Sequence, residues 1–112
     1  MEIFQLKNSS VSISGDYYQI IFADDFDDVD RPYFLVQCDL EFPSKECYIE
    51  CLNEKLIGHY LVNSIDIEDR AFNIKYGPND KFAVRIEYQA TNEEQNKLVG
   101  AAITMFNKVN IS

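Results

Sequence analysis

Apolar and polar residues alternate along most of the chain with a period of two. The clearest example is the segment 81–88, KFAVRIEY, in which every second side chain is large and apolar. This alternation is typical of a strand with one buried face. The preceding segment 72–76, FNIKY, shows the same period, and the residues between them, GPND at 77–80, favour a tight reversal. The pattern therefore predicts a β-hairpin over residues 72–88.

The same period predicts further strands in the first two thirds of the chain. The segment 33–40, YFLVQCDL, is apolar at both parities at its start, which is typical of a central strand. A turn around Pro43 separates it from the next strand, CYIECL, and residues 58–76 are interpreted as a pair of strands. The remaining expected strands are an edge strand at 2–6, a hairpin formed by 11–13 and 17–22, the segment 47–52 with Cys47, Ile49 and Cys51 on one face, and 61–67.

The period changes once, near the end of the chain. Thr91 is followed three residues later by Glu94, the spacing of a helix capping box. Apolar residues then recur at helical spacing, which predicts an amphipathic helix over about residues 92–107. Leu98, Ala102 and Met105 are expected to pack on the sheet. The predicted fold class is α+β: a mostly antiparallel β-sheet or small β-sandwich, with one C-terminal helix over one face.

Composition fits a single domain spanning residues 1–112. Hydrophobic residues make up 46% of the chain and aromatic residues 13%, which is enough for a core without disulfides or metals. The net charge of −9 disfavours direct binding to nucleic acid or to anionic membranes and favours a basic partner. No apolar stretch approaches the roughly 18 residues that span a bilayer. The first residues, MEIFQLKNSS, do not resemble a signal peptide.

The three cysteines and the single histidine predict neither a metal site nor a catalytic centre. Cys38, Cys47 and Cys51 all fall in strand-like segments, where a free cysteine behaves as a small buried hydrophobe. Cys47 and Cys51 would lie about 13 Å apart on one strand, too far for shared metal coordination or a disulfide. The odd count favours a reducing cytoplasm. His59 has no predicted partner, so we expect a protein that is not an enzyme and holds no cofactor or metal.

The most unusual stretch is FADDFDDVDRPYF at residues 22–34, where five aspartates fall within seven positions. It does not match a calcium-binding EF-hand loop, because the fifth position from Asp25 is Val29 and the sixth is not glycine. A weaker cation site remains an open alternative. Clustered carboxylates can steer a basic partner and raise its association rate by about 10- to 1,000-fold. Phe26 and Tyr33 could anchor that partner, although Phe26 could equally be a core residue.

The predicted partner-binding site therefore combines this acidic run with its aromatic neighbours. Later strands could extend the acidic face through Tyr48, Glu50, Glu54 and Tyr60, depending on the strand order. The predicted site residues are Asp24, Asp25, Phe26, Asp27, Asp28, Asp30 and Tyr33.

The order of segments over residues 33–107 resembles the immunity proteins of bacterial polymorphic-toxin and contact-dependent growth inhibition systems. It is most similar to the tenth family of such immunity proteins. The residues that carry the resemblance are YIE at 48–50, the strand pair that begins at Tyr60, and the ending with Leu98 and Phe106. None of these is a catalytic motif, and no functional residue is carried over from the family.

The resemblance implies a small cytoplasmic protein that binds and neutralises one cognate toxin domain, often a nuclease, by covering its active site. A nuclease holds a polyanion in a basic site, which carboxylates could occupy where phosphates would lie. We expect a monomer that forms a 1:1 complex. One alternative is an acidic secretion chaperone or adaptor, although many of these begin with a helix and dimerise. Another is an enzyme that uses His59 with nearby carboxylates.

Overall fold

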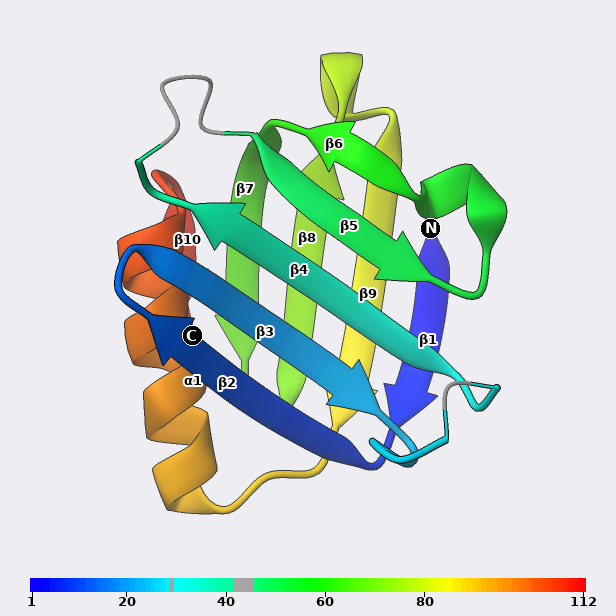
Figure 1. The fold of residues 1–112 in the computed structure, drawn as a ribbon, viewed down its shortest axis with the longest axis vertical. Coiled ribbons are helices and arrows are strands. Elements are labelled where there is room, and N and C mark those ends of the chain that lie inside the picture. The colour runs from blue at the N-terminus through cyan, green and yellow to red at the C-terminus, as the bar shows by residue number, and fades with distance from the viewer. Residues whose placement is uncertain (29, 42–45) are drawn as a thin grey trace.

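The chain folds into two β-sheets and one long helix, as the sequence predicts for an α+β protein. A computed structural model describes residues 1–28, 30–41 and 46–112. The two sheets pack face to face. In Figure 1 the sheet formed within residues 8–60, called sheet B, lies in front of the sheet formed by residues 2–6, 62–88 and 109–111, called sheet A. The predicted turn around Pro43 lies outside the described residues. None of the helices in the described ranges is long and apolar enough to cross a membrane.

Sheet B is antiparallel throughout and has the order β2-β3-β4-β5-β6. The segment predicted to be a central strand, now β4, lies in its middle. The hairpin predicted near the N-terminus is confirmed as β2 and β3. The strands are β2 (Asn8–Ser14), β3 (Tyr17–Ala23), β4 (Tyr33–Asp39), β5 (Cys47–Cys51) and β6 (Gly58–Tyr60).

Sheet A is mixed and has the order β1-β9-β8-β7-β10. Its inner strands are antiparallel, whereas the edge strands β1 and β10 run parallel to their neighbours. The predicted edge strand at 2–6 and the predicted hairpin around GPND are both confirmed, and Gly77 takes a φ of 84° at that turn. The strands are β1 (Glu2–Leu6), β7 (Val62–Glu68), β8 (Ala71–Tyr76), β9 (Phe82–Tyr88) and β10 (Val109–Ile111).

The chain crosses between the sheets twice, which the alternation of residues did not indicate. It leaves sheet A at Lys7, between β1 and β2, and returns at Leu61, between β6 and β7. The predicted pair of strands within residues 58–76 is confirmed as the antiparallel pair β7 and β8, whereas residues 58–60 form a separate short strand, β6, in sheet B. Two short 3-10 helices, η1 (Glu54–Leu56) and η2 (Pro78–Asp80), lie in connections.

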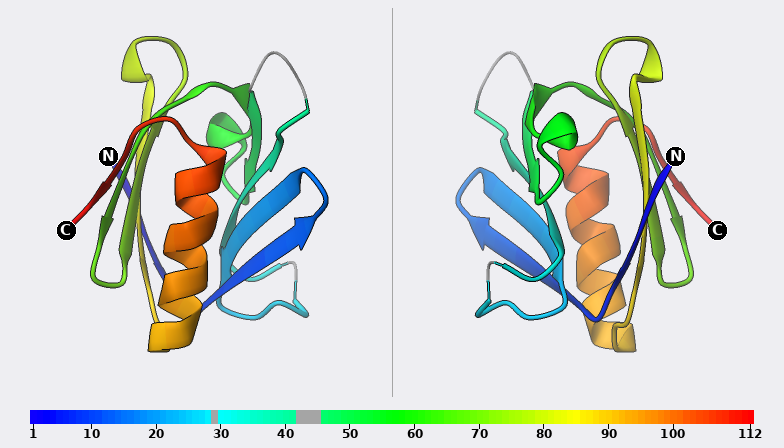
Figure 2. Two further views of the ribbon diagram at one scale, coloured as in Figure 1. Left: turned by 90° about the vertical axis from the view of Figure 1, so that its left-hand side faces the viewer. Right: turned by 90° about the vertical axis from the view of Figure 1, so that its right-hand side faces the viewer.

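The helix α1 (Asn92–Met105) begins at the predicted capping box. The Thr91 hydroxyl accepts the Glu94 N–H at 3.1 Å, and the Glu94 carboxylate accepts the Thr91 N–H at 2.8 Å. The helix ends two residues earlier than expected. It lies along the open side between the two sheets and contacts β2 and β3, so it closes one side of the sandwich instead of covering a face (Figure 2).

The core fills the space between the inner faces of the sheets. The Phe22 ring on β3 lies 5.3 Å from the Phe72 ring on β8 and 4.9 Å from the Tyr88 ring on β9, measured between centroids. The predicted helix contacts are confirmed, because Leu98 and Ala102 are fully buried and Met105 nearly so. The sheets are thus joined by aromatic contacts across the middle and by the helix at the side.

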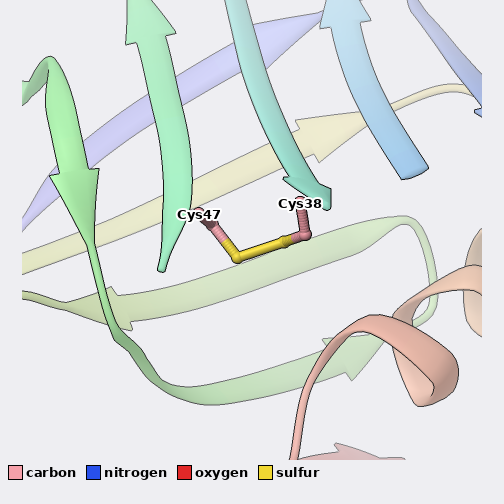
Figure 3. Close-up of a disulfide and its surroundings, with 2 residues drawn as sticks. All are labelled: Cys38 and Cys47. Atoms are coloured by element: carbon pink, nitrogen blue, oxygen red, sulfur yellow. A yellow bond between two sulfur atoms is a disulfide. The ribbon is translucent and has the colours of Figure 1, made fainter. Parts of the chain in front are cut away.

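The expectation of three free cysteines is wrong for two of them. Cys38 on β4 and Cys47 on β5 are opposite each other in the sheet and form a disulfide, with 4.6 Å between their Cα atoms (Figure 3). That separation is typical of directly opposed residues in antiparallel strands. The sequence argument considered only the separation of Cys47 and Cys51 along one strand, so it missed the pairing of Cys38 with Cys47 across two strands. Cys51 is free and buried, as expected.

Candidate functional site on the outer face of sheet B

The outward face of sheet A is polar and internally paired. Arg85 on β9 donates to Glu68 at 2.7 Å and to Glu87 at 3.1 Å, and its guanidinium also reaches Asn73 at 3.2 Å. Such a network is satisfied in water, and exposed pairs of this kind contribute little to stability. This face has the character of an ordinary solvated surface.

The outward face of sheet B is different, because aromatic and aliphatic side chains gather on it. Leu35 on β4 lies between Ile21 on β3 and Glu50 on β5 in the strand register. Tyr48 lies opposite His59, and their rings are 5.0 Å apart. The side chains that share this face include Tyr17, Gln19, Ile21, Ala23, Tyr33, Leu35, Gln37, Asp39, Tyr48, Glu50 and His59. The arrangement suits contact with another molecule, since aromatic residues are enriched in protein interfaces.

The aspartates lie in the connection from β3 to β4, which we call the aspartate loop (residues 24–32). Asp24 forms its base. Its carboxylate accepts the Lys7 N–H at 3.2 Å and pairs with Arg31 at 3.6 Å, and only 16% of the side chain is exposed. Its N–H donates to the Pro32 carbonyl at 3.2 Å. Asp24 therefore fastens the loop to the sheet.

Two further aspartates shape the loop itself. The Asp25 carboxylate accepts the Asp27 N–H at 2.9 Å, and the Asp28 carboxylate accepts the Asp30 N–H at 3.0 Å. These are Asx turns, in which a short side chain replaces a backbone acceptor two residues before the donor. Asp27 and Asp30 accept no hydrogen bond within the described part of the chain, and both are exposed. The run thus combines turn formation with displayed charge.

Phe26 does not enter the core. Its side chain is 46% exposed and helps to line a pocket of about 250 Å³ where the aspartate loop meets sheet B. Among the described residues, those that line the pocket are Ile21, Ala23, Asp25, Phe26, Asp28, Tyr33, Leu35 and Glu50. The alternative of a core phenylalanine is therefore wrong, and Phe26 is available to a partner.

Glu50 lies at the centre of a hydrogen-bonded group on this face. Tyr33 donates its hydroxyl to Glu50 Oε2 at 2.7 Å, and Tyr48 donates its hydroxyl to Glu50 Oε1 at 2.8 Å. Burial, followed by the bond to Glu50, raises the pKa of Tyr33 to about 12. The bond to Glu50 is also the main cause that raises the pKa of Tyr48. Both hydroxyls are thus held in the neutral, donating form.

The structure brings together only part of the predicted site. Asp25, Phe26, Asp28 and Tyr33 line one pocket, while Asp24 lies at the loop base and Asp27 and Asp30 project from the loop. The role of these residues in partner binding stays a prediction.

Of the residues expected to extend the acidic face, Tyr48 and Glu50 do lie on it. Tyr60 does not, because it faces the core, with its ring centroid 5.4 Å from that of Tyr76. Glu54 lies on η1, beyond the end of β5. Ile21 and Leu35 were missed, although their alternation with core residues in β3 and β4 indicates that they point outward.

A second group of acidic residues lies at the other end of β4. Glu41 donates its N–H to Asp39 at 3.0 Å, and a side-chain hydrogen bond with Asp16, followed by the nearby negative charges, raises the pKa of Glu41. Across the described residues, no group of three or more His, Cys, Asp or Glu side chains is arranged to hold a metal ion.

Comparisons with known proteins give no relative for this chain. No family model matches it, no curated protein matches it, and no solved structure matches it.

Proposed function

We propose that this protein is an immunity protein that binds and neutralises a cognate toxin domain with a basic active site, most simply a nuclease. The observation that carries the proposal is the outer face of sheet B, where partly exposed aromatic side chains gather and the aspartate loop borders them. The resemblance over residues 33–107 supports the same function.

Electrostatics supports a basic partner. The chain has a net charge of −9, and Asp27 and Asp30 project from the loop with exposed side chains. Complementary charge steers two proteins toward each other and raises the association rate. A nuclease active site binds phosphates with cationic groups, so carboxylates presented together can occupy the same positions. Complex formation would then relieve repulsion between the aspartates.

The aromatic residues supply the affinity that charge alone does not. Phe26, Tyr33 and Tyr48 are partly exposed around one pocket and one carboxylate. Aromatic anchors at the centre of an interface are often hot spots, whose truncation costs about 2 kcal/mol or more of binding free energy. The hydroxyl bonds to Glu50 hold two of them in place before binding, which lowers the entropy cost of association.

The proposed compartment is the cytoplasm, with a free monomer that forms a 1:1 complex. The Cys38–Cys47 disulfide is the observation that opposes it, because disulfides form mainly in oxidising compartments. The state of these two thiols in protein isolated under alkylating conditions decides between the two compartments.

The test is to express the C-terminal region of the protein encoded immediately upstream and measure its binding to this chain at low and moderate salt. The proposal requires tight, salt-sensitive binding that also abolishes toxicity in cells. A neighbouring product that is neither toxic nor bound would contradict the proposal and favour an acidic adaptor.

A further inference from the structure

The pocket between the aspartate loop and sheet B combines apolar walls with negative charge. Its walls are apolar or aromatic, from Ile21, Phe26, Tyr33 and Leu35, whereas its charged lining residues are all carboxylates. We propose that this pocket receives one arginine side chain of the partner, with the guanidinium group against Glu50. The inference rests on the proposed function insofar as the arginine is supplied by the toxin.

Within the part of the chain that the structure describes, the lining contains three carboxylates, from Asp25, Asp28 and Glu50, and neither lysine nor arginine. The nearby Arg31 pairs with Asp24, which is outside the lining. Negative charge in a concave site with apolar walls is felt more strongly than on an open surface. The pocket is therefore complementary to a cation, and it disfavours phosphate and carboxylate ligands.

Glu50 is oriented for this role and is not saturated. Each of its two oxygens accepts one tyrosine hydroxyl, from Tyr33 at 2.7 Å and from Tyr48 at 2.8 Å. An ionised carboxylate offers about four acceptor positions, so about two remain. Both oxygens can then accept from a guanidinium group, whose planar donors match a carboxylate.

The aromatic walls favour arginine over lysine. The side chains of Phe26 and Tyr33 line the same pocket, so a planar guanidinium group can stack against a ring while its N–H groups reach Glu50. Arginine stacks on aromatic faces, and such cation–π contacts contribute about 0.5–2 kcal/mol. The volume of about 250 Å³ is also below the roughly 300–1,000 Å³ of typical small-molecule sites, and it suits a single side chain.

The direct test uses a short peptide in place of the toxin. A tripeptide with a central arginine and blocked ends is titrated into the ¹⁵N-labelled protein, beside the same peptide with citrulline or lysine. Citrulline keeps the shape of arginine and removes its charge. With the arginine peptide, we expect saturable changes in the amide chemical shifts of Phe26, Tyr33, Leu35 and Glu50. The lysine peptide should bind more weakly, and the citrulline peptide should not bind. Equal shifts with citrulline, or shifts centred elsewhere, would overturn the proposal.

Variants then connect the pocket to the toxin. Glu50→Gln keeps the side-chain shape and should weaken binding of the arginine peptide by about tenfold or more, because a charged hydrogen bond is lost. Glu87→Gln is the matched control: Glu87 also accepts from two side chains, Gln5 and Arg85, but on the outer face of sheet A. Phe26→Ala, which alters an exposed residue, provides a second variant should Glu50→Gln unfold.

The two proposals can fail separately. Peptide binding in the pocket supports the arginine site even where no toxin is found, in which case only the immunity function fails. A toxin that binds wild type and Glu50→Gln equally would support immunity and overturn the assignment of the arginine to the toxin.

Discussion

Tyr33 and Glu50 are diagonal neighbours on adjacent strands, and their side chains are joined by a 2.7 Å hydrogen bond. Tyr33 is the first residue of β4 after the aspartate loop, so this bond connects the end of the loop to the C-terminal part of β5. Tyr48 holds the other oxygen of the same carboxylate. The pocket, the loop and the outer face of sheet B therefore form one supported surface.

The bond makes the titration of Tyr33 diagnostic. The pKa of Tyr33 is raised to about 12, first by burial and then by Glu50, so Tyr33 should ionise well above the ordinary value of 10.0 in a spectrophotometric titration. Glu50→Gln removes the negative charge and should bring this late step closer to the ordinary value of 10.0. Tyr33→Phe identifies the step by deleting it. An unchanged late step in Tyr33→Phe would contradict the assignment.

The same shift predicts how stability depends on pH. A pKa raised in the folded state means that the neutral hydroxyl stabilises the fold fully below about pH 10, and that this contribution is lost as the pH rises toward 12. The free energy of unfolding, measured by urea denaturation from pH 8 to 11.5, should therefore fall at the alkaline end. The free energy of unfolding of Tyr33→Phe should fall less steeply with pH than that of wild type. Burial raises the pKa of Tyr76 and Tyr88 as well, so part of the decline persists.

The aspartates of the loop should separate into a structural and a recognition group. Asp27→Asn with Asp30→Asn removes two exposed charges that shape no turn, so we expect weaker toxin binding with a reduced salt dependence and unchanged stability. Glu2→Gln with Glu93→Gln, two exposed carboxylates away from the loop, controls for net charge. Calorimetry at two salt concentrations measures the difference. Equal effects of both pairs would show that only net charge matters.

The turn-forming aspartates should respond to the kind of substitution. Asp25→Asn and Asp28→Asn keep an oxygen that can accept the N–H two residues on, whereas Asp25→Ala and Asp28→Ala do not. We expect the alanine pair to lower the free energy of unfolding by about 0.5–1.5 kcal/mol per bond and the asparagine pair to change it little. Urea denaturation measures both. Equal stability of the two pairs would remove the structural role.

Local chemistry made the strands and the helix start predictable from sequence. The period of two identified β8 and β9, because each strand turns one face toward the core and the other toward solvent. Thr91 and Glu94 marked the beginning of α1 because capping involves residues only three apart. Burial and capping are local patterns, so a single sequence contains enough information to locate them.

What the sequence did not predict depends on contacts between distant residues. The assignment of β6 and β7 to different sheets, and the parallel pairing of β10 with β7, require the strand order. The Cys38–Cys47 disulfide requires the register of β4 against β5. The same limit applied to the prediction of the candidate site. The aspartate loop is recognisable in the sequence as a run of acidic residues, whereas Glu50 comes close to it only through the pairing of β4 with β5.

The disulfide predicts a specific count of thiols. Protein purified without reductant and denatured should react with one equivalent of a thiol reagent, at Cys51, and with three after reduction. The two cysteines are nine positions apart, and closing a loop of that size stabilises a fold by about 2.5 kcal/mol in the chain-entropy model. Cys38→Ser with Cys47→Ser should therefore unfold at lower urea concentration, while Cys51→Ser keeps the bond. Three reactive thiols in unreduced protein would contradict the disulfide.

Phe26 should matter for binding and not for folding. Its side chain is 46% exposed and lines the pocket, so Phe26→Ala removes a wall that a partner would contact without opening a cavity in the core. We expect toxin binding to weaken by about 2 kcal/mol, as for an aromatic hot spot, with the free energy of unfolding unchanged within about 0.5 kcal/mol. Ile103→Ala is the control, because Ile103 is 57% exposed on α1, away from the outer face of sheet B. Calorimetric binding and urea denaturation of both variants give the comparison. A large loss of stability in Phe26→Ala would instead make Phe26 a structural residue, and full binding by that variant would move the interface away from the pocket.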